Sequence, residues 1–296
     1  MKRIYLLGSL NCDLSIRAPY LPERGETLKG SDFMINAGGK GANQACACAK
    51  LGGKIRMAGA VGKDSFGDML LASLKSAGAD ISTVRRTERN TGVAVITVVD
   101  GDNRIILDEG ANGEVTEADA LALLNGAQSG DIFVTQLENP FPVVLNALKL
   151  ARERGLFTVF NPAPAKAEAR EAVKYSDLIT PNRKELRLLS GKEGLDEGCE
   201  ELLALGAGCV IVTLGEKGSL IYKRGVRLEV PCVSAGEAID TTGAGDTFCG
   251  ALCVRLAEGA ELAEAARFAS VCAGIAVTRR GAQIAIPTRE EADRFL

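Results

Sequence analysis

Histidine is absent from all 296 residues of this chain. Its absence excludes a Ser-His-Asp triad, a Cys-His nucleophile pair and any metal site built on histidine ligands. A general acid or base must therefore be an aspartate, glutamate, lysine, tyrosine or cysteine side chain. The chemistry has to be sought among carboxylates, amines and backbone amides.

Runs of like charge and long apolar runs are missing as well. The 35 basic and 38 acidic residues give a net charge of −3, which argues against a nucleic acid or an anionic membrane as the main partner. The first apolar run covers only residues 4–7. A signal peptide needs roughly 7–15 apolar residues, and a bilayer span needs roughly 18. We therefore expect a cytoplasmic protein that binds neither nucleic acid nor membrane.

The chain also lacks Cys-x-x-Cys pairs, although it has nine cysteines. Most of them lie among alanine, valine and leucine, as in the Cys-Ala-Cys-Ala run at residues 46–49. An odd number of such residues favours small buried thiols in a reducing compartment over a redox or metal role.

What is present predicts an α/β fold. The length is near the upper end of what one core supports, so we predict a single domain over residues 1–296. From about residue 110, short apolar runs alternate with helical patterns. This alternation implies a three-layer arrangement, a mostly parallel sheet with helices on both faces. The predicted strands cover residues 131–137, 156–160, 177–180 and 209–213, and the predicted helices cover 142–154, 167–175, a segment from 183, 195–205, 244–258, 261–277 and a short capped segment from 288.

Two regions break this alternation. Residues 91–107 resemble two strands joined by an Asp-Gly turn, and parts of residues 11–36 also look extended. These pieces predict a small antiparallel β lid, but they fit an extension of the main sheet edge about equally well. The 93–99 strand is apolar on both faces, so each face needs a cover. As a lid, it could close over a ligand on one face and pack on a second subunit with the other.

The segment that indicates a function most clearly is a glycine-rich turn that leads into the 244–258 helix. Gly243 and Gly245 let the backbone approach an anion closely, and the amides of a helix N-terminus attract negative charge. Asp246 follows in the first turn. Phosphoryl transfer asks for this kind of positioning and charge neutralisation. On spacing alone, an ordinary strand-to-helix connection fits slightly better. The chain has neither a G-x-x-x-x-G-K-[ST] loop nor a G-x-G-x-x-G after a strand.

A second glycine-rich turn covers residues 37–44 and opens another helix. Lys40 and Asn43 would give this turn a polar rim for sugar hydroxyls or an anion, although a tight turn with a solvated lysine explains it about as well. Asn11, Asp13 and Glu138 follow predicted strands, where parallel sheets present ligand groups. The convergence of several such groups is the stronger signal.

Together, these segments resemble the ribokinase, or phosphofructokinase-B-type, family of carbohydrate kinases. The motifs are Gly38-Gly39-Lys40-Gly41-Ala42-Asn43-Gln44 and Asp240-Thr241-Thr242-Gly243-Ala244-Gly245-Asp246, and the similarity covers essentially the whole chain. Further matching segments lie at residues 8–13, 136–138, 161–165, 180–185, 212–218 and 276–283. The resemblance implies a ribokinase-like fold with a β lid and ATP-dependent phosphorylation of D-ribose at its 5-hydroxyl.

The resemblance also assigns roles to residues. Asp246 would be the catalytic base, and the amides of Gly243, Ala244 and Gly245 would form the anion hole. The sugar would be held by Asn11, Cys12, Asp13, Gly39, Lys40, Gly41, Ala42, Asn43, Glu138 and Asp246. ATP would be held by Asn182, Thr213, Leu214, Gly215, Glu216, Lys217, Gly218, Gly245, Asp246 and Ser270. Glu185 would place Mg²⁺ through water, and an activating K⁺ would lie at Asp240, Thr242, Ala276, Arg279, Gly281 and Ala285.

Two positions depart from the family pattern. Ser270 stands where a ribokinase can carry histidine, and Ala285 stands where a serine can contribute to the potassium site. Other substrates stay open: deoxyribose, fructose or a nucleoside would suit the same machinery. A non-catalytic sugar- or nucleotide-binding module is the alternative from a different class. The lid further predicts a homodimer joined through residues near 11–36 and 91–107.

Overall fold

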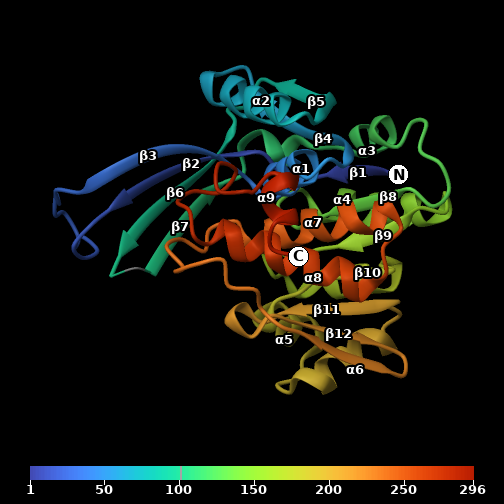
Figure 1. Cartoon of the computed structure of the whole chain (residues 1–296). Helices are drawn as coiled ribbons and strands as arrows, with labels where there is room; N and C mark the ends of the chain where they lie inside the picture. Colours follow the sequence, from blue (N-terminus) through green and yellow to red (C-terminus); the bar gives the residue numbers. More distant parts are fainter. Residues whose placement is uncertain (101) are drawn as a thin grey trace.

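The computed structural model describes residues 1–100 and 102–296 and contains two separate sheets (Figure 1). The nine-stranded main sheet has the spatial order β13 (Val226–Val230), β12 (Ser219–Lys223), β11 (Cys209–Thr213), β10 (Leu178–Ile179), β9 (Phe157–Phe160), β8 (Ile132–Thr135), β1 (Arg3–Leu7), β4 (Lys54–Gly62) and β5 (Asp80–Thr87). Its strands pair in parallel from β5 to β11, and β12 and β13 continue the sheet antiparallel.

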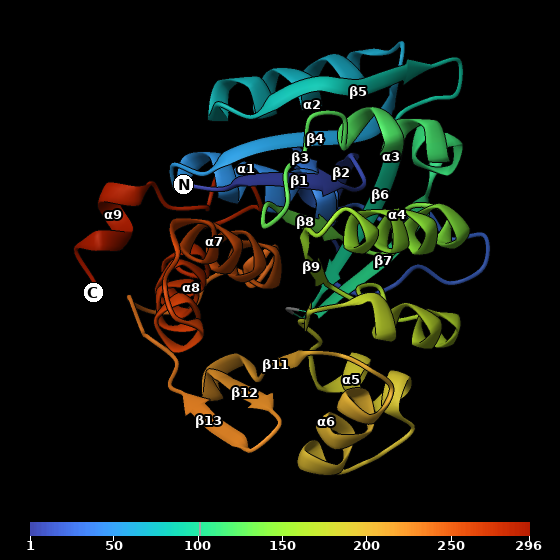
Figure 2. The same ribbon diagram turned by 90° about the vertical axis from the view of Figure 1, so that its right-hand side faces the viewer.

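Helices cover both faces of this sheet, so the three-layer prediction is confirmed (Figure 2). One face packs on α1 (Lys40–Lys50), α2 (Ser65–Ala77), α7 (Ala244–Glu258), α8 (Leu262–Ala276) and α9 (Arg289–Asp293). The other packs on α3 (Glu117–Leu123), α4 (Phe141–Glu153), the 3₁₀ segment η2 (Ala167–Tyr175), α5 (Arg183–Ser190) and α6 (Leu195–Ala204). Successive side chains of a strand point to opposite faces. Accordingly, Leu6 packs in the α1–α7 layer and Leu7 in the α3–α6 layer.

Most predicted elements agree with the structure, and α7 and β11 have the predicted ends. The α9 capping box is also confirmed, because the Thr288 hydroxyl accepts a hydrogen bond from the Glu291 amide. One helix differs in type: residues 167–175 form 3₁₀ turns. Ala169 and Ala172 are buried there, and a spacing of three residues matches the three residues per turn of a 3₁₀ helix.

The second sheet settles the alternative between a lid and an extended main sheet in favour of the lid. Its spatial order is β3 (Ser31–Gly38), β2 (Asn11–Arg17), β6 (Gly92–Val99) and β7 (Asp102–Asp108). It projects from one end of the main sheet (Figure 1). The β2–β3 and β6–β7 pairs are antiparallel as predicted, whereas the central β2–β6 pair is parallel. The predicted Asp-Gly turn includes residue 101, which lies outside the described residues.

The two faces of the lid differ in what they meet. Asp13, Ser15 and Arg17 of β2 line a cavity. On the outer face, register aligns Ile35, Leu14, Val95 and Ile106 in a row across the four strands. Ile35, Val95 and Ile106 are exposed. Among the helices that the structure describes, none is long and apolar enough to cross a membrane.

Candidate active site

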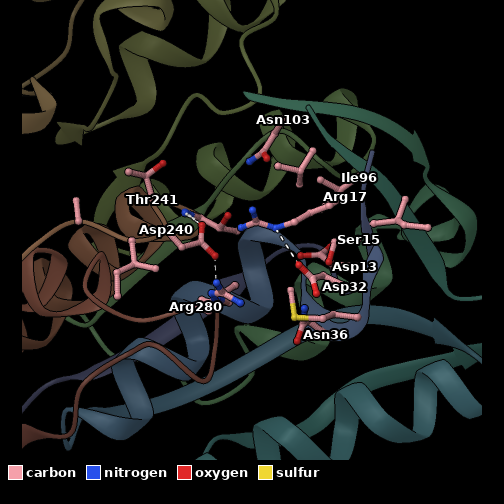
Figure 3. Close-up of a pocket in the computed structure, with 18 residues that line it drawn as sticks. Asp13, Ser15, Arg17, Asp32, Asn36, Ile96, Asn103, Asp240, Thr241 and Arg280 are labelled. Atoms are coloured by element: carbon pink, nitrogen blue, oxygen red, sulfur yellow. Dashed lines mark hydrogen bonds and ion pairs between the residues drawn. The ribbon is translucent and has the colours of Figure 1, made fainter. Parts of the chain in front are cut away.

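Two neighbouring cavities lie where the lid meets the main sheet. The first, of about 270 Å³, lies between the lid and residues 238–242 and 280–282 (Figure 3). The second, of about 240 Å³, lies at the N-terminus of α7 and is lined by Lys40, Asn161, Thr180, Asn182, Glu185, Thr213, Gly243, Gly245 and Asp246, among others. Thr241 lines both cavities. The two cavities are therefore adjacent.

The N-terminus of α7 is open to the second cavity. Gly243 is the N-cap residue with φ of +73°, and no side chain caps the helix. The first bond of the helix runs from the Thr247 amide to the Gly243 carbonyl at 2.8 Å. The Ala244 amide makes a 3.2 Å turn bond to the Thr241 carbonyl. Gly245 is exposed, and a side chain there would meet nothing within 4 Å. This turn therefore leaves room for an anion beside the helix N-terminus.

Asp246 is held by two amides from α1. Its Oδ1 accepts from Gln44 Nε2 at 3.1 Å and its Oδ2 from Asn43 Nδ2 at 3.0 Å. The side chain is buried, with 7% of the residue exposed. A close approach of α1 and α7 makes these bonds possible, because a Cβ on Gly250 would lie 2.6 Å from Ala47 Cβ. The two glycine-rich motifs therefore meet at one carboxylate.

Glu138 organises the other side of the site. Its Oε2 accepts from Ser9 Oγ at 2.5 Å, from the Lys40 amide at 3.1 Å and from Asn11 Nδ2 at 3.3 Å. Asn112 donates to Asn11 Oδ1 at 2.7 Å. Sequence reasoning gave Ser9 and Asn112 no role. Ser9 could have been found from its place beside Asn11 after the first strand, whereas nothing local marks Asn112.

Charge is concentrated around Asp13 and Lys40. Burial raises the pKa of Asp13 to about 7, helped by the negative charges of Glu138 and Asp246 and opposed by Lys40. Burial acts to lower the pKa of Lys40, but the surrounding carboxylates outweigh it and raise that pKa. Lys40 therefore stays positively charged among carboxylates, where it can meet further negative charge.

The predicted nucleotide residues lie on α5, β11 and the turn after β11. Asn182 caps α5: its Oδ1 accepts from the Glu185 amide at 2.9 Å, and Glu185 Oε2 accepts from the Asn182 amide at 2.7 Å. Asn182 also bridges to Thr213. The η3 turn, Gly215–Lys217, is exposed, with Leu214 and Gly218 on either side. Ser270 is buried on α8, a helix that packs against β12 and β13.

The predicted magnesium residue, Glu185, lines the second cavity. Burial is the largest influence on Glu185 and raises its pKa, Asp246 acts in the same direction, and the Asn182 amide and Lys40 oppose them. Mg²⁺ commonly uses one or two carboxylates together with substrate phosphates. Glu185 fits this pattern because it lines the second cavity with Asp246. The described residues contain no group of three or more His, Cys, Asp or Glu side chains that could hold a metal alone.

The predicted potassium residues come from the segment before α7 and from the end of α8 and the segment after it, and Asp240 ties these two regions together. Its carboxylate accepts from the amides of Thr242 and Gly281, each at 2.9 Å. Burial acts to raise the pKa of Asp240, but these hydrogen bonds and Arg17 outweigh it and lower that pKa. The Ala276 carbonyl accepts from the Arg279 amide at 3.1 Å, and Ala285 is buried. These hydrogen bonds hold the predicted potassium residues in one corner of the structure.

Of the predicted sugar residues, Asp13 lines the first cavity, and Lys40 and Asp246 line the second. The other seven line neither cavity, and all of them except Glu138 are buried: Asn11, Cys12, Gly39, Gly41, Ala42, Asn43 and Glu138. Gly41 packs α1 against the end of β1, since its Cβ would lie 2.5 Å from the Gly8 carbonyl carbon. Gly39 has φ of +89°, and its Cβ would lie 2.6 Å from the Asn11 amide nitrogen. These small residues let the glycine-rich turn approach the strand end.

Known proteins of the same kind share this architecture. The family model described as pfkB family carbohydrate kinase matches residues 1–289. The chain is 39% identical to the ribokinase of Schizosaccharomyces pombe, over 99% of this chain and 97% of the relative. The structure of ribokinase from Thermotoga maritima is similar with a TM-score of 0.91 and 36% identity, covering 100% of this chain and 99% of that one.

A third protein is similar in structure and was solved with ligands. The Arabidopsis thaliana ribokinase complexed with ribose and ATP has a TM-score of 0.89 and 30% identity, covering 99% of this chain and 98% of that one. The matches extend over the main sheet, the lid and both glycine-rich motifs. The chain therefore belongs to the pfkB family and is a carbohydrate kinase.

Proposed function

We propose that this carbohydrate kinase is a ribokinase, which transfers the γ-phosphoryl group of ATP to O5 of D-ribose and yields ribose 5-phosphate and ADP. The observation that carries the proposal is the position of Asp246. Its carboxylate lines the cavity at the N-terminus of α7, next to the lid cavity, and two amides of α1 hold it. The full-length similarity to ribokinases supports ribose as the acceptor.

Asn11, Asp13, Gly39, Lys40, Asn43 and Glu138 are the residues that we assign to the sugar. Carboxylates and amides together accept from and donate to sugar hydroxyls. Glu138 and Asn11 are already linked to each other, so this part of the site is ordered before the sugar binds. Such preorganisation lowers the entropic cost of positioning a hydroxyl for reaction.

Asp246 takes the proton from the sugar hydroxyl as the new bond from O5 to the γ-phosphorus forms. The bond from that phosphorus to the ADP oxygen breaks, and ADP leaves with the electron pair. The reaction develops negative charge on the transferring group. The amides of Gly243, Ala244 and Gly245 and the Lys40 ammonium would stabilise that charge, since donors fixed in advance cost no reorganisation.

ATP would extend from the second cavity across Asn182 and Thr213 to residues 214–218, with Ser270 behind. Glu185 would hold Mg²⁺ through water, and the corner of Asp240, Thr242, Ala276, Arg279, Gly281 and Ala285 would hold K⁺ through backbone oxygens. These cations would neutralise part of the phosphate charge. The cytoplasm is the proposed compartment, supported by nine free thiols, all buried except Cys232.

The lid supports a homodimer. The outer row of Ile35, Leu14, Val95 and Ile106 is an apolar face with exposed members, and such faces mark interaction sites. In the dimer, this face would pack on the second subunit while the inner face closes over the sugar. A monomer in sedimentation at micromolar concentration would contradict this part of the proposal.

A coupled assay of ADP release tests the function. We expect turnover with ATP and ribose and faster turnover when potassium replaces sodium. Deoxyribose, fructose and nucleosides should give a lower kcat/KM. For deoxyribose and nucleosides, the lost hydroxyl leaves a polar partner unpaired at about 1–3 kcal/mol. A higher kcat/KM for one of these sugars would overturn ribose as the substrate. ADP release with none of them would support a binding module.

A further inference from the structure

A chain of buried amide side chains, formed by Gln136, Gln44 and Asn161, lies behind Asp246; Gln44 and Gln136 line neither cavity, and Asn161 lines the second. Gln136 Nε2 donates to Gln44 Oε1 at 2.6 Å, and Gln44 Nε2 donates to Asp246 Oδ1 and to Asn161 Oδ1, each at 3.1 Å. Asn161 Nδ2 in turn donates to the Thr180 carbonyl at 2.8 Å. Gln44 is fully buried and lines neither cavity. It therefore acts on the reaction through Asp246 and not through the substrates.

The hydrogen bonds between these amide side chains have a defined direction. An amide side chain can exchange its oxygen and nitrogen by rotation, so its partners decide which end faces which way. Gln136 occupies the Gln44 oxygen as a donor, which leaves the Gln44 NH₂ group for Asp246 and Asn161. The opposite rotamer would place an amide oxygen against a carboxylate oxygen and an NH₂ group against an NH₂ group. As a donor to the Gln44 oxygen, Gln136 therefore favours the same Gln44 rotamer as the Asp246 carboxylate does.

The burial of Asp246 makes this donor important. A buried carboxylate without hydrogen-bond donors is costly, and a hydrogen bond to a charged group contributes roughly 1.5–3 kcal/mol. Asn43 supplies one donor to Oδ2 and Gln44 supplies the other to Oδ1. Each oxygen keeps a lone pair for an incoming hydroxyl. Loss of Gln44 would leave one oxygen without a donor and the carboxylate free to rotate.

We propose that Gln44 is a positioning residue for Asp246 and that Gln136 acts through it by setting the direction of its amide. This inference rests on the proposed role of Asp246 as the base. The row of amide side chains also connects the Asp246 side of the site with its Glu138 side. Gln136 lies two residues before Glu138, in the segment that follows β8. One segment thereby orients the base through Gln136 and contacts the sugar residues through Glu138.

The first test compares Gln44→Met with Thr158→Val. Gln44→Met keeps the length of the side chain and removes both amide groups, and we expect kcat to fall roughly 10- to 100-fold, or about 1.4–2.7 kcal/mol, with the KM for ribose changed less than threefold. Thr158 is also fully buried, and its hydroxyl bonds to the Tyr175 carbonyl and to Asp177, away from both cavities. Thr158→Val should lower stability and leave kcat within twofold.

Substitutions at Gln136 test the direction of the hydrogen bonds between the amide side chains. Gln136→Met frees the Gln44 amide to rotate, whereas Gln136→Glu places an acceptor opposite the Gln44 oxygen and favours the wrong rotamer. We expect Gln136→Glu to lower kcat more than Gln136→Met at neutral pH. The double variant Gln44→Met/Gln136→Met should be no slower than Gln44→Met alone, because Gln136 acts through Gln44.

Gln44→Glu gives a pH signature that a merely structural residue would not give. Two adjacent carboxyl groups raise the affinity of one of them for a proton. When the introduced carboxyl is protonated, it can donate to Asp246 as the amide does. We therefore expect kcat of this variant, relative to the native chain, to recover as the pH falls from 8 to 6. A ratio that does not change with pH would contradict the inference.

Two further outcomes would overturn the inference: a Gln44→Met enzyme with kcat within twofold of native, or additive losses in the double variant. If Gln44→Met does not fold, the comparison of Gln136→Met with Gln136→Glu decides. If the native chain phosphorylates no sugar, the proposed function fails, and the inference is read from NMR instead. The Gln44 side-chain NH₂ signals should then exchange slowly and shift in Asp246→Asn. Rapid exchange or no shift would refute it.

Discussion

The two sheets of this chain differ in how far their apolar residues are buried. The interior strands of the main sheet are buried on both faces by helices, and β11 is buried over four of its five residues. In the lid, every residue of β7 is exposed, including Ile105, Ile106 and Leu107. The main sheet is covered by helices of the same chain, whereas the outer face of the lid is exposed. The first can hold a reacting group rigidly, and the second has faces that, in the proposed function, would meet a ligand and a second subunit.

The largest expected effect is a loss of kcat from a substitution beside the main sheet. Asp246→Asn keeps the shape of the side chain but removes the base, and positioned bases contribute about 10²–10⁴-fold. We expect kcat to fall by that factor, while ribose and ATP bind within a few-fold of native affinity in calorimetry. Near-normal turnover would end the assignment of the base.

The next effect is the loss of unfolding free energy when an apolar side chain is truncated in each sheet. Leu6→Ala in the main sheet removes a fully buried side chain and should cost about 2–5 kcal/mol of the free energy of unfolding. Ile106→Ala in the lid removes a side chain that is 75% exposed in one chain and should change that free energy by less than about 0.5 kcal/mol. Urea unfolding at low protein concentration measures both. Equal losses would mean that the lid is stabilised within one subunit.

A third effect concerns the outer face of the lid. Ile106→Ser should weaken self-association roughly tenfold or more, since full burial of an isoleucine side chain is worth about 1.5–3 kcal/mol. Ile284→Ser is a matched control, because Ile284 is 72% exposed outside the lid. Sedimentation at several concentrations compares them. If both variants associate as the native chain does, the dimer does not use this face.

The smallest effect is a pH dependence at the inner face of the lid. In the proposed site, sugar hydroxyls would donate to the ionised form of Asp13, whose pKa burial raises to about 7. Affinity should therefore be present above that pH and be lost as the pH falls through it, so the KM for ribose should be up to about tenfold higher at pH 6 than at pH 8. Asp13→Asn should raise KM and remove this dependence. A dependence that survives the substitution would assign it to another group.

Local sequence accounts for much of the fold and for part of the site. The ends of α7 and β11 follow from apolar periodicity and from glycines at the boundaries. Asn11, Asp13, Glu138 and Asp246 could be selected because strand ends and helix starts carry polar groups for local reasons. The roles within that set, and the sugar, came from resemblance to a family and not from spacing.

The amide chain behind Asp246 could not be read from local patterns. Gln44 lies 92 residues from Gln136, 117 from Asn161 and 202 from Asp246 in the sequence. Nothing near any of these residues indicates its partners. The close approach of α1 to α7 at Gly250 brings them together.

By itself, the sequence determined the alternation of strands and helices, the absence of histidine chemistry and the two glycine-rich helix starts, because each depends on neighbouring residues. Only the tertiary structure decided that the lid is a separate sheet, that its central strands run parallel and that both helix starts meet at one carboxylate. Those outcomes depend on contacts between segments far apart in the chain, whose free energies no local pattern encodes.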